Sequence, residues 1–180
     1  MKKVYYAGIG SRETPIKILE SMRLIASVFA KHGLILRSGG AEGADTAFEE
    51  GCLQRNGSCE IWIPWINFQQ RKLNTYLPTE EHYLKASTLH PVWDRLSRGP
   101  RSLHARNVCQ VLGMDLNTPV SFVVCYTRDG ATSFEQVTQK TGGTGTAIKL
   151  ASSLGIPVIN MFNKDYTHQL KEVIKSLDID

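Results

Sequence analysis

The strongest constraint on the fold is a unit that occurs three times along the chain: a short apolar run, a glycine-rich loop and a helical segment. The three runs and the loops that follow them are residues 4–7 with 8–11, 34–36 with 38–45, and 120–126 with 141–146. Short apolar strands that alternate with helices are typical of a parallel sheet that is covered on both faces. The sequence therefore predicts an α/β fold with a parallel sheet and helices on both faces.

Apolar runs and helical spacing also predict the bounds of the main elements. We expect five strands, at residues 4–7, 34–36, 60–63, 120–126 and 157–161. We expect helices at residues 15–32, 47–56, 101–112, 145–154 and 170–177. No periodicity survives between residues 64 and 100, and a stretch of this length is usually a functional lid or contains short helices. The prediction is a single domain over residues 1–180, with an irregular insert or lid at about 64–100.

The charge balance bears on the class of partner. The 180 residues carry a formal net charge of +4, with a pI near 8.9. This mildly basic balance suits a phosphate-bearing partner, but the chain lacks the dense lysine and arginine runs expected of a nucleic-acid coat.

The cysteines and histidines give no pattern of metal ligands. Cys52, Cys59, Cys109 and Cys125 lack paired ligand spacing, and the five histidines form neither a helical pair nor a cluster with cysteine. We therefore expect reduced thiols, no metal and no cofactor. No apolar run is long enough to span a bilayer, and the chain begins with a strand rather than a signal peptide, which predicts a cytoplasmic protein without a membrane partner.

The three glycine-rich loops all leave the same edge of the predicted sheet. In an open parallel sheet, ligands bind beyond the carboxyl ends of the strands, where the strand order reverses. Glycine lets the backbone approach a ligand closely, and the unpaired amides of a first helical turn favour a phosphate. We therefore expect one phosphate-binding crevice. Its candidate ligand-binding residues are Gly8, Gly10, Ser11, Arg12, Arg37, Ser38, Gly39, Gly40, Asp45, Thr127, Asp129, Thr141, Gly142, Gly143, Thr144, Gly145 and Thr146.

Several of these side chains have two interpretations. Arg12 either supplies a cation to the crevice or is neutralised by Glu13, and Arg37 is either a ligand or a solvated charge. Asp45 either holds ribose hydroxyls or complements the dipole of the helix that it begins. Asp129 follows an apolar strand and is well placed for a ligand.

Two common nucleotide-binding motifs are absent from the sequence. The dinucleotide fingerprint fails because Gly8-Ile9-Gly10 is followed by Ser11-Arg12-Glu13, and Arg37 stands where an acidic residue would end the second strand. The phosphate-loop motif fails because no Gly-Lys-Ser/Thr follows a spaced glycine. Hydride transfer and ATP hydrolysis therefore have no support.

The first two loops resemble a known family. Residues 7–12, and above all Ser38-Gly39-Gly40-Ala41 with Gly43 and Asp45, resemble the Rossmann-like core of the DNA-processing protein A (DprA/Smf) family in the SLOG superfamily. The whole chain is also similar to short phage-encoded proteins known as DprA-like. They share the pattern Arg106-Asn107, Cys125-Tyr126-Thr127, Asp129-Gly130 and Thr141-Gly142-Gly143-Thr144-Gly145.

Two segments resemble the LOG phosphoribohydrolases of the same superfamily. Residues 103–107 are similar to the Met-His-Glu-Arg-Lys-like helix of that family, and residues 142–146 to its Pro-Gly-Gly-x-Gly-Thr-x-x-Glu loop. The resemblance places Arg106 on the functional arginine, which makes Arg106 a further candidate ligand for phosphate or ribose. Lys149 stands where the LOG enzymes carry a catalytic glutamate. A lysine there would repel the positive charge of N-glycoside cleavage and attract phosphate instead, so no catalytic residue is assigned.

These observations lead to one hypothesis and two alternatives. The hypothesis is a protein that binds a nucleotide or a nucleotide-derived signalling molecule, ADP-ribose-like or cyclic, and senses or sequesters it without turnover. The alternatives are a LOG-type nucleoside 5′-monophosphate N-glycosidase and a protein that binds single-stranded DNA in recombination, as DprA relatives do. The resemblance also implies a homo-oligomer, for which the helix at 101–112 and the last helix offer apolar faces.

Overall fold

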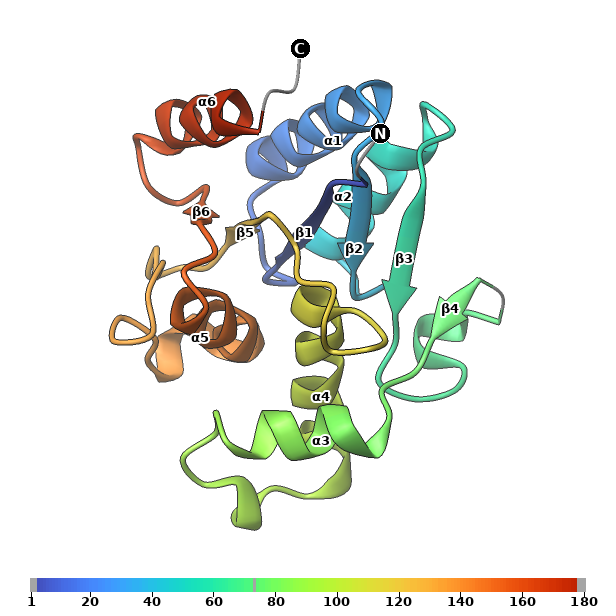
Figure 1. Cartoon of the computed structure of the whole chain (residues 1–180), viewed down its shortest axis with the longest axis vertical. Helices are drawn as coiled ribbons and strands as arrows, with labels where there is room; N and C mark the ends of the chain where they lie inside the picture. Colours follow the sequence, from blue (N-terminus) through green and yellow to red (C-terminus); the bar gives the residue numbers. More distant parts are fainter. Residues whose placement is uncertain (1–2, 73, 178–180) are drawn as a thin grey trace.

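A six-stranded, all-parallel sheet forms the centre of the molecule. The computed structural model describes residues 3–72 and 74–177. The strand order is β4-β3-β2-β1-β5-β6, as Figure 1 shows. The strands are β1 (Tyr5–Gly10), β2 (Ile35–Ser38), β3 (Cys59–Trp62), β4 (Thr75–Tyr76), β5 (Phe122–Tyr126) and β6 (Val158–Asn160).

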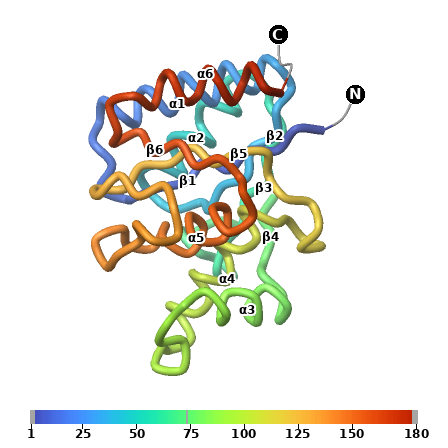
Figure 2. The backbone as a smooth tube through the Cα atoms, turned by 60° about the vertical axis from the view of Figure 1, so that its left-hand side comes forward, coloured from blue at the N-terminus to red at the C-terminus, as the bar shows by residue number. Residues whose placement is uncertain are grey.

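Helices cover both faces of this sheet (Figures 1 and 2). One face packs against α1 (Ile16–Lys31), α2 (Ala44–Leu53) and α6 (Tyr166–Ser176), and the other against α4 (Arg98–Leu112) and α5 (Gly145–Ser153). Successive strand residues point to opposite faces, so Tyr6 belongs to the first core and Ala7 to the second. Both are fully buried, which is why the central strands β1 and β5 carry no charged residue.

The segment at 64–97 consists of short elements that the sequence pattern does not reveal. They are η1 (Phe68–Gln70), β4, α3 (Glu80–Ser87) and η2 (Trp93–Arg95). The helix α3 packs on α4, and the surrounding chain extends away from the sheet beyond it (Figure 2). The helix α4 begins at Arg98 rather than at residue 101, because Ser97 is its extended N-cap residue and a proline is tolerated in the first helical turn.

The predicted α/β fold with a parallel sheet is confirmed, with β4 as a sixth strand that was not predicted. The predicted domain, residues 1–180, includes residues 1–2, 73 and 178–180, which lie outside the described residues. Within the described part of the chain, no helix combines the length and apolar character needed to cross a bilayer.

The strand order reverses beside β1. From β1 the chain proceeds outward to β2, β3 and β4, and then returns through α4 to β5 on the other side of β1. The loops that follow β1 and β5 therefore run in opposite directions and leave a crevice between them at the carboxyl edge of the sheet.

Candidate functional site

A pocket of about 560 Å³ lies at this reversal point. Five segments contribute to its wall: the end of β1 with the loop after it, the start of α2 with the loop before it, one face of α4, the loop after β5, and η3 (Gln139–Thr144). The lining residues are Ile9, Gly10, Ser11, Arg12, Glu13, Ala41, Asp45, Leu103, Arg106, Asn107, Gln110, Arg128, Gln139, Lys140, Thr141, Gly142, Gly143 and Thr144. We call the buried residues Asp45, Arg106 and Gln110 the inner end, and the exposed residues Arg12, Glu13, Arg128, Gln139 and Lys140 the mouth.

The η3 turn is held in place by Asp129. One carboxylate oxygen of Asp129 accepts hydrogen bonds from Thr141 Oγ1 at 2.5 Å and from Thr138 Oγ1 at 3.4 Å. The other accepts from Thr127 Oγ1 and from the amide of Ala131. Partial burial would raise the pKa of Asp129, but the hydrogen bonds from Thr141 and Thr127 outweigh it and leave the pKa below its usual value. Asp129 thus shapes the wall of the pocket without lining it.

The same turn is fixed from the side of α4. The amide of Asn107 donates a hydrogen bond to the carbonyl oxygen of Gly143. Gly142 has a φ of 71°, which favours glycine, and a kink at this residue joins the turn to the rest of η3. The helix α5 begins directly after the turn, so its first amides lie at the edge of the pocket.

A buried cluster around Gly39 forms the inner end. Arg106 Nη1 donates to the carbonyl oxygen of Gly39 at 2.6 Å and lies 3.4 Å from Asp45 Oδ2. The same carboxylate accepts from the amide of Ala41 at 3.3 Å. A Cβ at Gly39 would overlap Arg106 Nη1 and approach Gln110 and Asp45, so only glycine permits this arrangement.

Burial dominates the electrostatics of this cluster. Burial raises the pKa of Asp45, and the nearby guanidinium of Arg106 offsets only part of that effect. Burial likewise lowers the pKa of Arg106, against the attraction of Asp45. The 3.4 Å ion pair therefore does not fully compensate for the loss of water around the two groups.

Two polar atoms of the inner end have no hydrogen-bond partner among the residues that the structure describes. They are Arg106 Nε and Gln110 Oε1. Arg106 is 8% exposed and Gln110 is 1% exposed. Buried polar atoms are nearly always paired in folded proteins, so these two mark a place where a partner is expected.

The mouth carries most of the positive charge. Arg12, Arg128 and Lys140 are exposed there, and Glu13 forms an ion pair with Arg128. The interpretation that Glu13 neutralises Arg12 is therefore wrong, because Glu13 forms its ion pair with Arg128.

The structure brings half of the predicted ligand-binding residues together at this pocket. Those that line it are Gly10, Ser11, Arg12, Asp45, Arg106, Thr141, Gly142, Gly143 and Thr144. The others do not line it: Gly8, Arg37, Ser38, Gly39, Gly40, Thr127, Asp129, Gly145 and Thr146.

Several residues of the second group have structural roles that keep them out of the pocket. Ser38 Oγ donates to the carbonyl oxygen of Gly8, and the backbone of Gly8 packs against Phe48. Gly40 accepts a hydrogen bond from Arg71 through its carbonyl oxygen. Thr146 Oγ1 lies 2.7 Å from His104 Nδ1 on α4.

Arg37 lies elsewhere in the molecule. Its guanidinium forms an ion pair with Glu60 at 2.7 Å, donates to the carbonyl oxygen of Thr118 and stacks 4.1 Å from the ring of Tyr5. Tyr5 begins β1 and Thr118 precedes β5, so Arg37 lies toward the amino ends of these strands, away from the pocket.

Lys149 also faces away from the pocket. Its ammonium group donates to the carbonyl oxygen of Leu89 at 3.4 Å and lies 5.1 Å from the ring of Phe134. The expectation that Lys149 attracts phosphate to the glycine-rich loop is therefore wrong, because Lys149 lies on a different face of α5.

Four residues that line the pocket were not among the predicted ligand-binding residues: Gln110, Arg128, Gln139 and Lys140. Gln110 lies four residues after Arg106, so both point from one face of α4. A polar residue at helical spacing from a candidate ligand, within five final helix residues that are otherwise apolar, is the signal that identifies Gln110.

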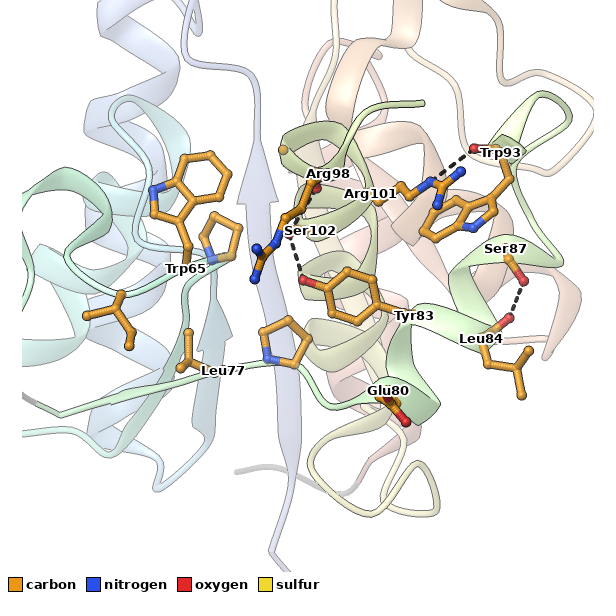
Figure 3. Close-up of a pocket in the computed structure, with 14 residues that line it drawn as sticks. Trp65, Leu77, Glu80, Tyr83, Leu84, Ser87, Trp93, Arg98, Arg101 and Ser102 are labelled. Atoms are coloured by element: carbon orange, nitrogen blue, oxygen red, sulfur yellow. Dashed lines mark hydrogen bonds between the residues drawn. The ribbon is translucent and has the colours of Figure 1, made fainter. Parts of the chain in front are cut away.

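A second, larger pocket of about 1130 Å³ lies between the 64–79 segment, α3 and the start of α4 (Figure 3). Its walls include Trp65, Leu77 and Leu84, which are exposed apolar residues. Three of its polar side chains take part in hydrogen bonds: Tyr83 Oη lies 2.6 Å from Ser102 Oγ, and Arg101 Nε donates to the carbonyl oxygen of Trp93. This pocket is larger, but among its lining residues that the structure describes none has an unpartnered buried polar atom, so the pocket at the reversal point is the candidate site.

Solved structures with this fold include a carrier of a small molecule. The molybdenum cofactor carrier protein MCP from Chlamydomonas reinhardtii aligns with 99% of this chain and 85% of its own chain, at 16% identity and a TM-score of 0.53. No family model and no curated protein matches the sequence.

They also include two DNA processing proteins A. The Helicobacter pylori protein, studied for its single-stranded DNA binding mode, aligns with 94% of this chain and 72% of its own, at 19% identity and a TM-score of 0.54. The Streptococcus pneumoniae protein aligns with 100% of this chain and 62% of its own, at 16% identity and a TM-score of 0.51. At these identities the similarity shows a DprA-like fold and does not extend to function.

Proposed function

We propose that the protein binds a nucleotide or a nucleotide-derived molecule, ADP-ribose-like or cyclic, in the pocket at the reversal point, and senses or sequesters it. One observation carries the proposal: loops from separate crossover units line a single pocket whose inner end holds the buried, incompletely bonded Arg106. A pocket of about 560 Å³ is within the usual range for a small-molecule site.

The phosphate would lie at the η3 turn. The backbone of Gly142 and Gly143 lines the pocket there, and α5 begins at the next residues. The amides of a first helical turn and the helix dipole favour an anion. Arg12 and Lys140 at the mouth add positive charge.

Binding without turnover fits the carboxylates at this pocket. LOG-type cleavage requires a carboxylate near the sugar, and the corresponding residue here is Lys149, which faces away. Among the lining residues that the structure describes, the carboxylates are Glu13 and Asp45. Glu13 pairs with Arg128, and Asp45 accepts from the amide of Ala41 and lies close to Arg106.

Isothermal titration calorimetry tests the proposal. The panel comprises AMP, GMP, CMP, UMP, cyclic AMP, cyclic GMP and ADP-ribose, and we expect at least one of them to bind with a micromolar Kd. Lys140→Met should weaken that binding about three- to tenfold by removing an exposed cation near the phosphate, on the scale of an ordinary net hydrogen bond of about 1 kcal/mol. Lys149→Met, a matched lysine on the far face of α5, should leave binding unchanged. A wild-type protein that binds none of the panel would refute the proposal.

Two further measurements test the alternative functions. The N-glycosidase alternative is supported by Asp45, which is a buried carboxylate with a raised pKa on the pocket wall. Chromatography of the incubated nucleotides would reveal free base if Asp45 acts as an acid. Gel shifts with single-stranded oligonucleotides at low salt would detect DprA-like DNA binding, which weakens steeply with salt.

A cytoplasmic homo-oligomer of the phage DprA-like type remains part of the proposal. The two helices expected to supply an interface are both used within the chain. The apolar face of α4 packs in the second core, and α6 packs its apolar residues into the first. Exposed apolar residues lie instead on α1, at Ile16 and Leu24, and on the insert. Light scattering of the purified protein would measure the oligomeric state.

A further inference from the structure

The unpartnered atoms of the inner end show which part of a ligand it accepts. Five buried side-chain atoms lack a hydrogen-bond partner among the described residues: Tyr6 Oη, Glu49 Oε2, Trp62 Nε1, Arg106 Nε and Gln110 Oε1. Glu49 Oε2 lies 2.6 Å from Arg71 Nη2 in an ion pair, and Tyr6 and Trp62 are core residues away from the pocket wall. Only the last two atoms belong to residues that line the candidate site.

These two atoms form a donor and an acceptor on one helix face. Arg106 Nε carries a proton, and Gln110 Oε1 accepts one. The residues are four apart in α4, so their side chains are neighbours. Their other polar ends meet at Gly39, since a Cβ built there would approach both Arg106 Nη1 and Gln110 Nε2. A ligand group that accepts and donates at once would satisfy both atoms.

A second phosphate is a poor match for this inner end. Phosphate oxygens at neutral pH accept hydrogen bonds and would face the acceptor Gln110 Oε1 without a proton to offer. The carboxylate of Asp45, 3.4 Å from Arg106 Nη1, already offsets the charge of the guanidinium. Among the described lining residues, the cations that form no ion pair lie at the mouth, at Arg12 and Lys140. The pocket is therefore polarised, with the anion toward the mouth and a neutral group inside.

A nucleobase is also a poor match. Bases are usually held between aromatic or large apolar side chains. No aromatic residue lines this pocket within residues 3–72 and 74–177, and its apolar residues are Ile9, Ala41 and Leu103. A sugar hydroxyl, which donates and accepts together, fits the pair of atoms without an aromatic wall.

We propose that Arg106 and Gln110 form a hydroxyl-binding subsite that holds the ribose of a phosphorylated ligand, so that the protein recognises the sugar phosphate and not the base. This inference rests on the proposed function and deepens it. It adds Gln110 as a specificity-determining residue.

Calorimetry with matched sugars tests the subsite in the wild-type protein. The probes are ribose 5-phosphate, AMP and ADP-ribose, together with 2′-deoxy-AMP and 3′-deoxy-AMP. Ribose 5-phosphate should bind within about tenfold of AMP, because the base adds little. At least one deoxy form should bind about 10- to 100-fold more weakly than AMP, the range expected when buried polar atoms lose their partner.

The substitution Gln110→Met isolates the new residue. Methionine has nearly the same length and no strong hydrogen-bonding group, so the ratio of AMP to deoxy-AMP affinity should fall to about threefold or less. Removal of an unpartnered buried acceptor should leave the folded state intact, which thermal unfolding checks. Gln54→Met, the same change at an exposed glutamine that ends α2, should keep the wild-type ratio.

The outcomes separate this inference from the proposed function. A wild-type protein that binds the phosphorylated probes with no preference for the ribose hydroxyls would overturn the subsite and leave nucleotide binding standing. An unchanged preference in Gln110→Met would also overturn it. If base identity changes affinity by more than about a hundredfold, the sugar is not the recognised part. Absence of binding to every probe would overturn both. If Gln110→Met does not fold, the wild-type comparison alone decides.

Discussion

The two pockets of this molecule differ in whether the buried polar atoms of their lining residues have hydrogen-bond partners. In the larger pocket, beside the 64–79 segment, the side chains of Tyr83, Ser102 and Arg101 form hydrogen bonds with neighbouring groups. In the pocket at the reversal point, Arg106 and Gln110 keep unpartnered atoms although both are almost fully buried. The larger volume belongs to the first pocket. The difference teaches that pocket size alone does not select the candidate site, because the smaller pocket is the one whose lining residues carry unpartnered buried atoms.

The helix α4 takes part in both pockets, which makes matched substitutions possible. Its first turn, with Arg98 and Arg101, lines the insert pocket, and its later turns, with Arg106 and Gln110, line the other. Substitutions in α4 can therefore be compared between the two pockets without changing the helix that carries them.

The largest difference should come from the two arginines Arg106 and Arg98. Arg106→Met leaves Asp45 buried without its cation, and we expect a loss of about 3 kcal/mol in the free energy of unfolding and loss of nucleotide binding. Arg98 is exposed, so Arg98→Met should change stability by less than about 0.5 kcal/mol. Urea unfolding measures both. Equal effects of the two substitutions would remove the contrast between the pockets.

Acid should lower the stability of the folded state through His104 on α4. Burial, with smaller contributions from His90 and Arg106, lowers the pKa of His104 to about 4, while the unfolded chain has a pKa of about 6.5. The unfolded state therefore takes up the proton first, and stability is complete above pH 6.5 and falls as the pH approaches 4. The loss should reach up to about 3 kcal/mol. His104→Asn, which keeps a polar atom near Thr146, should flatten this dependence in urea unfolding from pH 7 to pH 4, and an unchanged slope would contradict the assignment.

The next difference should come from two glycines. Gly39→Ala would place a methyl group into the guanidinium of Arg106, and we expect a loss of about 1–3 kcal/mol in stability and weaker nucleotide binding. Gly99→Ala meets nothing within 4 Å, and it should stabilise α4 by up to about 1 kcal/mol. Calorimetric unfolding and titration compare the two variants. A silent Gly39→Ala would show that the inner end tolerates repacking.

The smallest effect should come from Tyr83→Phe in the insert pocket. It removes the hydrogen bond between Tyr83 and Ser102, while Ser102 Oγ still donates to the carbonyl oxygen of Arg98. We expect a loss of about 1 kcal/mol in stability and no change in nucleotide affinity. A clear change in affinity would link the two pockets and weaken the distinction between them.

The sheet was predictable because its signal is local. The apolar runs of β1, β2 and β5 are buried on both faces, and glycine-rich loops follow them, so a single sequence reveals their alternation with helices. The two residues of β4 carry no such period, because a strand this short is defined by its pairing with β3 rather than by its own composition.

The candidate site was predictable only in its loops. The sequence places Arg37 at the end of β2, but the face toward which it points depends on the neighbours of the strand, and Glu60 and Thr118 hold it elsewhere. Lys149 likewise has the position of a motif residue but lies on another face of α5. Gln110 was missed because its role depends on α4 crossing beneath Gly39, a contact between residues far apart in the sequence.

The short length of β4 also affects whether copies of the protein can aggregate through the edge of the sheet. An outer strand with a long row of free amide and carbonyl groups invites a strand from a second molecule, and aggregation follows. Here the outer strand β4 pairs through Thr75 and Tyr76 alone, and Pro78 lies just beyond them. The β4 border of the sheet is therefore too short to template the growth of a fibril.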